Sequence, residues 1–173
     1  MLQHYSLSWL NTYANTNDNL CIHFFWGHTN EQQLPAGKFC FSQWYPSPFV
    51  VDDITYATAE HWMMAQKALL FDDAACFEKI IASETPSLAK KLGRSVAGFD
   101  EITWDERKFD LVKLGNIHKF NQHKPFAEYL LSTGDDIIAE ASPTDNIWGI
   151  GLHATHKDAS DITAGAKTCW ALP

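Results

Sequence analysis

A carboxylate and an amine lie on one face of the helix that this sequence predicts most strongly. The helix covers residues 58–71, with Thr58 as a cap and good helix formers (Ala, Leu, Met, Gln and Lys) in its interior. Glu60 and Lys67 are separated by roughly 10 Å along its axis and by only about 20° around it. The stripe that they occupy, with i, i+3, i+4, i+7 spacing, also contains apolar residues: Met63, Met64, Leu70 and Phe71.

Two explanations fit charged residues on a stripe that is normally buried. In the first, the stripe reaches the edge of the protein, where the helix N-terminus stabilises Glu60 and Lys67 extends its amine into water. In the second, this face is the floor of a polar pocket, because burying a charge without partners is costly and needs a reason. The helix alone does not decide between them.

Other residues that suit a nucleotide-like ligand are scattered along the chain. Trp104 and Arg107 come near the start of a later helix, and Arg94 follows the end of another. Asp145 and Trp148 lie in a glycine-containing loop after a predicted strand. Each also has a purely structural interpretation: a cover over a helix start, a side chain that binds terminal carbonyls, a turn cap or a core residue.

Together, these side chains are the ones that cleavage of a nucleoside-like bond requires. Carboxylates stabilise an oxocarbenium-like centre and position water. An aromatic ring holds the base, and a cation holds phosphate. Lys67 adds a covalent option, because a desolvated amine can trap the ring-opened sugar aldehyde as a Schiff base.

Composition and charge are those of an ordinary globular chain. Its 173 residues are 46% hydrophobic and 20% charged, which fits one domain with its own core. The formal net charge of −8 argues against broad, non-specific binding of nucleic acid, but it is compatible with a small basic pocket for a phosphate. The 7 Trp and 11 Phe are more than packing tends to demand, and flat rings also stack on nucleobases.

The sequence predicts a cytoplasmic protein without a metal or a cofactor. No signal peptide and no long apolar run is recognisable, so we expect reduced thiols and no membrane span. The 4 cysteines form no C-x-x-C pair: Cys21, Cys40, Cys76 and Cys169. Dinucleotide, Walker, H-E-x-x-H and G-x-S-x-G motifs are absent. His153 and His156 lie in a glycine-flanked loop without nearby cysteine or carboxylate, which favours a surface position over metal binding.

The remaining patterns predict short strands and several helices. Strands are expected at 21–26, 38–42 and 137–141, with a hairpin over 50–56 that turns at Asp52-Asp53. Helices are expected over 74–82, 86–92 and 125–131. Thr103 and Glu106 fit a capping box that would open a long helix to about residue 121. We expect residues 1–20 to be an appended arm and residues 21–173 to form a single domain.

A set of short motifs occurs in a fixed order between about residues 22 and 152. The motifs are Phe41–Tyr45, Thr58–His61, Gln66–Ala68, Leu92–Arg94, Trp104, Arg107, Lys119-Phe120, Leu130–Asp135 and Glu140–Gly151. This ordered set resembles the NADAR family, the YbiA-like N-glycosidases. The resemblance implies an α+β fold: a helix-rich single domain with a small antiparallel sheet. It also implies hydrolysis of N-glycosidic bonds in ribosylamine-type intermediates of riboflavin synthesis or in ADP-ribose linked to guanine.

The resemblance assigns roles to particular residues. Catalytic positions fall on Glu60, Lys67 and Asp145. Substrate-binding positions fall on Trp104, Trp148, Gly149, Arg94 and Arg107, with the arginines as candidates for phosphate contact. The implied partner is a small nucleotide-like substrate, which includes ADP-ribosylated guanine in nucleic acid, and no membrane is implied.

Two departures from the family pattern leave an alternative open. Gln43 stands where the family commonly has Asn, and residues 161–170 match the usual closing segment poorly. The second departure motivates another hypothesis: a module that binds ADP-ribose or a related nucleotide and has lost catalysis.

Overall fold

The computed structural model describes Thr12, Thr16, residues 21–145, residues 149–156 and Ala159. In chain order the elements are β1 (Ile22–Phe25), the 3₁₀ helix η1 (Lys38–Phe41), β2 (Phe49–Val51), β3 (Ile54–Tyr56), α2 (Ala59–Leu70), α3 (Ala74–Ile81), α4 (Pro86–Gly93), α5 (Glu101–Gln122), α6 (Lys124–Leu131) and β4 (Ile137–Glu140). Helices alongside two small sheets confirm the helix-rich α+β class. Within the described part of the chain, no helix is both long enough and apolar enough to cross a membrane.

The chain divides into two compact units. The helical unit comprises His28–Ala36 and Gln43–Glu128. The strand unit comprises the described residues within Met1–Gly27, Gly37–Ser42 and Tyr129–Pro173.

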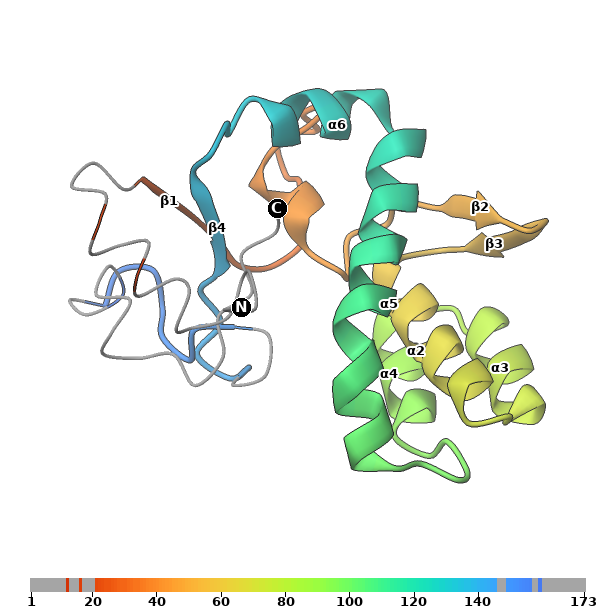
Figure 1. Cartoon of the computed structure of the whole chain (residues 1–173). Coiled ribbons are helices and arrows are strands. Elements are labelled where there is room, and N and C mark those ends of the chain that lie inside the picture. Colours follow the sequence, from red (N-terminus) through yellow and green to blue (C-terminus); the bar gives the residue numbers. More distant parts are fainter. Residues whose placement is uncertain (1–11, 13–15, 17–20, 146–148, 157–158, 160–173) are drawn as a thin grey trace. The chain divides into compact units, whose positions relative to one another are not determined.

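The helix α2 is the centre of the helical unit and packs against α3, α4 and α5 (Figure 1). The predicted cap is confirmed, because the Thr58 side chain accepts a hydrogen bond from the His61 backbone N–H. Seven consecutive residues, Ala59–Ala65, are buried. An amphipathic surface helix would expose some of them. This helix therefore holds its polar side chains in the interior of the unit.

Two glycines let neighbouring helices approach α2 closely. A Cβ at Gly115 of α5 would lie 2.6 Å from Nε1 of Trp62, and one at Gly93 of α4 would lie 2.8 Å from Cγ of Met64. Real Cβ atoms do not approach other atoms this closely. The two positions therefore fix how near α4 and α5 come to α2.

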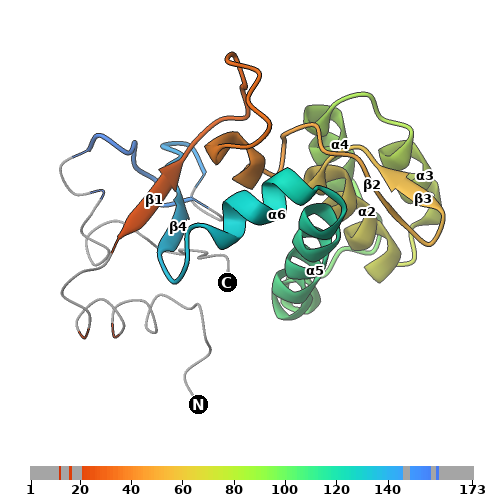
Figure 2. The same ribbon diagram turned by 90° about the horizontal axis from the view of Figure 1, so that it is seen from above.

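The β2–β3 hairpin lies beside α2 (Figure 2), and its aromatic rings belong to the same core. Its predicted turn is confirmed: Asp52 and Asp53 have φ of 49° and 64°, the left-handed values that a tight two-residue hairpin turn requires. Phe49 and Tyr56 pair across the strands, and the Tyr56 ring lies 4.9 Å from that of Trp62. The Trp62 indole also donates a hydrogen bond of 2.8 Å to the Leu111 carbonyl on α5.

Two local predictions are wrong. Residues 38–41 form a 3₁₀ helix rather than a strand, with Cys40 N–H bonded to the Gly37 carbonyl at 2.9 Å. Consecutive residues of a strand point to opposite faces, whereas Cys40 and Phe41 are both buried. The cap of α5 is Asp100 rather than Thr103, because its carboxylate accepts from both the N–H and the hydroxyl of Thr103.

The other elements follow the sequence patterns closely. Asp73 caps α3, and Thr85 followed by Pro86 opens α4. The helix α6 lies within one residue of its prediction, and Gly134 has the left-handed φ of 58° expected after a helix end.

The strand unit is built on a parallel pair. Strands β1 and β4 lie side by side, with Ile22 opposite Ile137 and Phe25 opposite Glu140 (Figures 1 and 2). Phe41 of η1 is buried, and its ring lies 5.7 Å from that of Phe25 on β1 and 5.4 Å from that of Tyr129 on α6. Both predicted strands are confirmed, and their parallel pairing brings together two segments that are far apart along the chain.

Candidate functional site

Glu60 is a buried carboxylate in the first turn of α2. Its exposed fraction is 2%, which is inconsistent with a position at an open protein edge. The Trp44 indole Nε1 donates a hydrogen bond of 3.2 Å to Oε2 of Glu60. The positive end of the helix dipole also favours a carboxylate in this turn. Burial therefore excludes the edge position for Glu60, and the polar pocket stays a prediction.

The segment that precedes the hairpin holds this carboxylate in place. The backbone N–H of Glu60 donates to the Gln43 carbonyl at 3.0 Å. The Gln43 side chain in turn donates to Asn116 on α5 at 3.0 Å. Gln43, the residue that departs from the family pattern, thus links the start of α2 to α5.

Trp44 has a charged neighbour on its ring. The Lys90 amine lies 5.8 Å from the Trp44 ring centroid, and the His28 ring lies 5.9 Å from it. One indole therefore contacts a buried carboxylate through its N–H while a cation lies over its ring.

Lys67 holds its amine against aromatic rings two turns along α2. The Nζ atom lies 3.9 Å from the Phe99 ring centroid and 5.5 Å from that of Trp104. Desolvation by burial lowers the pKa of Lys67, and the nearby Cys76 thiol opposes that shift. The amine is therefore neutral over a wider pH range than that of an exposed lysine, as a nucleophile or a proton acceptor requires.

The other predicted residues of the helical unit lie around these groups or on its surface. Trp104, in the first turn of α5, is half-buried and faces Lys67. Arg94 is the C-cap residue of α4, and both Arg94 and Arg107 are exposed. Exposed guanidinium groups are able to meet a phosphate from solvent, so their assignment to phosphate binding stays a prediction.

Asp145 and Gly149 belong to a tightly folded loop of the strand unit. The Asp145 N–H donates to the hydroxyl of buried Ser142 at 3.2 Å, and the Ile150 N–H donates to the Glu140 carbonyl at 2.8 Å. A Cβ at Gly149 would lie 2.8 Å from the Asp145 carbonyl oxygen, so this close approach requires glycine. Trp148 lies outside the described residues.

The sequence did not identify two contacts of this site. Phe99, the ring nearest to the Lys67 amine, precedes α5 without any motif that marks it. Trp44 did stand in one of the ordered motifs, and its aromatic type next to Gln43 was the available signal. His153, considered above as a metal ligand, is exposed, with Nδ1 2.8 Å from the Thr155 hydroxyl.

Comparison with known proteins identifies the family. The model of the NADAR domain matches residues 24–168, so the chain belongs to the NADAR family. It is 45% identical over 136 residues to N-glycosidase R617 of Acanthamoeba polyphaga mimivirus, a match that covers 76% of this chain and 78% of that protein. It is also 31% identical over 110 residues to riboflavin biosynthesis protein VVA0006 of Vibrio vulnificus, which covers 64% of this chain and 29% of that longer protein.

A solved structure confirms the fold. The NMR structure of the Escherichia coli protein YbiA superposes with a TM-score of 0.64 at 25% identity, covering 82% of this chain and 78% of YbiA. The resemblance inferred from the ordered motifs is therefore correct.

Proposed function

We propose that this protein is an N-glycosidase that hydrolyses the N-glycosidic bond of a phosphorylated ribosyl compound. The names of its relatives support the broad activity. The observation that carries the proposal for this chain is on α2, where a carboxylate that is 2% exposed precedes, by two turns, an amine whose pKa burial lowers. Burial of a charged group costs folding free energy, and both groups suit glycosidic chemistry.

Glu60 acts on the sugar carbon from which the base departs. As the N-glycosidic bond breaks, positive charge develops on the ring oxygen and C1, and a nearby carboxylate stabilises it. The same carboxylate, or that of Asp145, accepts a proton from the attacking water. The indole N–H of Trp44 orients the Glu60 carboxylate through one oxygen.

Lys67 has two chemically distinct roles open to it. As an acid, its ammonium group protonates the departing base while water attacks C1. As a nucleophile, its neutral amine forms a bond to C1 of the ring-opened sugar as the base leaves with a proton. Water then hydrolyses the resulting imine, which releases the sugar phosphate and restores the amine. The lowered pKa of Lys67 and the rings of Phe99 and Trp104 support the second role.

The remaining predicted residues bind substrate in this proposal. Trp104 and Trp148 stack on the base or exclude water from it. Arg94 and Arg107 contact phosphate, for which a guanidinium provides two parallel hydrogen bonds. Gly149 permits the close turn that positions the Asp145 backbone.

Two substrate classes follow from the family. One relative is named a riboflavin biosynthesis protein, which supports ribosylamine phosphates of that pathway as substrates. The second class is ADP-ribose joined to guanine, either free or in nucleic acid. Both present a ribose C1–N bond and a phosphate to the same set of side chains.

The test is hydrolysis by the purified protein, followed by chromatography of the released base. Riboflavin-pathway ribosylamine phosphates and ADP-ribosylated guanosine are assayed separately. We expect turnover of at least one, and about a 100-fold or larger loss in Lys67→Met. The matched control is Lys91→Met, an exposed lysine of α4, which retains activity.

Borohydride separates the two roles of Lys67. Trapping of a substrate adduct that Lys67→Met abolishes identifies the imine route, whereas turnover without an adduct identifies direct attack by water. Tight ADP-ribose binding without turnover supports the alternative, a binding module that has lost catalysis. The altered segment 161–170, which motivates that alternative, lies outside the described residues. Absence of both binding and turnover refutes both functions.

A further inference from the structure

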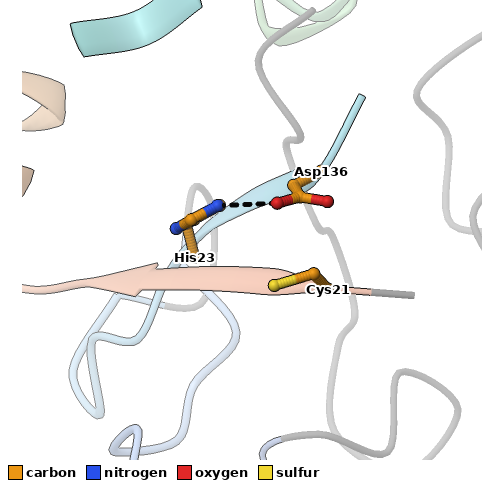
Figure 3. Close-up of side chains that lie close together, drawn as sticks. All are labelled: Cys21, His23 and Asp136. Carbon is orange, nitrogen blue, oxygen red and sulfur yellow. Dashed lines mark hydrogen bonds and ion pairs between the residues drawn. The ribbon is translucent and has the colours of Figure 1, made fainter. Parts of the chain in front are cut away.

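Three side chains with metal-binding atoms meet at the start of the β1–β4 pair. They are Cys21, His23 and Asp136, and their ligand atoms all lie within 4.8 Å of one another (Figure 3). Among the described residues, no other group of three or more His, Cys, Asp and Glu side chains is close enough together to hold a metal ion. We propose that it binds Zn²⁺ or a similar transition-metal ion.

The strand register explains why these residues meet. Cys21 and His23 are two apart along one strand direction, so their side chains project from the same face. Cys21 and Asp136 each precede by one residue the paired positions Ile22 and Ile137. The Ile137 N–H donates to the Cys21 carbonyl at 3.0 Å, which holds the two chain segments together at this point.

The donor set selects the class of metal. Thiolate and imidazole favour zinc and related ions, whereas Mg²⁺ and Ca²⁺ prefer sites made of oxygen alone. Zinc bond lengths and a tetrahedral angle place ligand atoms about 3.3–3.6 Å apart. The hydrogen bond of 2.9 Å between His23 Nε2 and Asp136 Oδ2 would therefore open slightly, while the distances from Cys21 Sγ, none above 4.8 Å, would adjust to this range. Rotation of side chains supplies movements of this size.

The site is accessible to an ion from solvent. Cys21 is exposed, and the side chains of His23 and Asp136 are 29% and 38% exposed. Cys21 is a free thiol in the structure. Three protein ligands leave the fourth tetrahedral position to water. No local motif marks this group, because Asp136 is 113 residues from His23 along the chain.

A metal ion at this site would link β1 to the start of β4, two strands that pair with no third strand among the described residues. The pair is a two-stranded parallel sheet, and isolated pairs of strands are marginally stable. Binding to the folded chain alone raises the temperature of unfolding. The proposed site is thus a structural metal site that links β1 to the start of β4, and it is independent of the glycosidase proposal.

The test is titration of the metal-free, full-length protein with Zn²⁺ or Co²⁺ alone. We expect one equivalent of Zn²⁺ to bind and to raise the Tm, and a chelator to reverse the effect. Co²⁺ should give the near-ultraviolet charge-transfer band of a thiolate ligand. Cys21→Ser should abolish that band, and both Cys21→Ser and Asp136→Asn should weaken Zn²⁺ binding by about 100-fold or more.

Matched controls keep the result interpretable. His153→Gln changes an exposed imidazole elsewhere in the strand unit and should leave the metal affinity unchanged. Without metal, Cys21→Ser should melt at the wild-type temperature, because the Cys21 side chain is exposed and lies outside the hydrogen bond between His23 and Asp136. A Co²⁺ complex without a thiolate band, or Zn²⁺ affinity that is unchanged in Cys21→Ser, would overturn the proposal and leave an ordinary ion pair between two strands.

Discussion

Substitution of Gly115 by alanine tests how closely α5 must approach α2. At an exposed position in a helix, Gly→Ala stabilises by about 1 kcal/mol. At Gly115 the new Cβ would lie 2.6 Å from Nε1 of Trp62, so the indole or the helix must move. Overpacking of this kind costs about 1–3 kcal/mol. Loss of the hydrogen bond from Trp62 to the Leu111 carbonyl adds about 1–3 kcal/mol, because it leaves a buried N–H without an acceptor.

The expected balance is a loss of unfolding free energy of about 1–5 kcal/mol after the gain in helix propensity is subtracted. For a chain of this length that is a decrease in Tm of about 2–20 °C. Urea denaturation followed by far-ultraviolet circular dichroism measures it. The control, Lys113→Ala, lies on the exposed side of the same helix and should stay within about 0.5 kcal/mol of wild type. If Gly115→Ala is instead about 1 kcal/mol more stable than wild type, the close packing of α5 against α2 is refuted.

Three further predictions concern His61, the cap of α5 and the surroundings of Lys67. Burial lowers the pKa of His61 from its ordinary value of 6.5, so below pH 6.5 the unfolded chain binds more protons than the folded chain. The unfolding free energy should therefore fall by up to about 1.4 kcal/mol for each pH unit of acidification, and urea denaturation at several pH values should show a weaker pH dependence in His61→Gln. Asp100→Ala should cost about 1 kcal/mol in the same assay, and a larger cost for Thr103→Ala would reassign the cap. Phe99→Ala should raise the pKa of Lys67 toward its ordinary value by admitting water, measured by NMR of the labelled amine; an unchanged pKa would contradict burial as the cause.

The sequence predicted elements whose signals are local. Thr58, Asp73 and Thr85 cap helices through bonds to residues three positions along, and the Asp52-Asp53 turn fixes its hairpin. The errors also have local causes. Alternation over five residues at 38–42 does not distinguish a strand from a 3₁₀ turn, and Asp100 is a stronger cap than the threonine that follows it.

Contacts between residues that are far apart along the chain could not be predicted from the sequence. The charged stripe on α2 did reveal Glu60 and Lys67, because charge in a buried pattern is visible without a structure. Their partners Trp44 and Phe99 come from other segments, and their proximity depends on tertiary packing. The group of Cys21, His23 and Asp136 depends on the pairing of two strands that are far apart along the chain.

Replacement of Glu60 by glutamine tests the central claim most directly, because stability and turnover are measured on one protein. Glutamine keeps an oxygen that can accept from Trp44 and removes only the charge, whose interaction with the helix N-terminus is worth about 0.3–1 kcal/mol. The account predicts an unfolding free energy within about 1 kcal/mol of wild type, with kcat/KM lowered by about 100-fold or more. Full turnover in Glu60→Gln, or a loss of activity that only follows the fraction of unfolded protein, would contradict it.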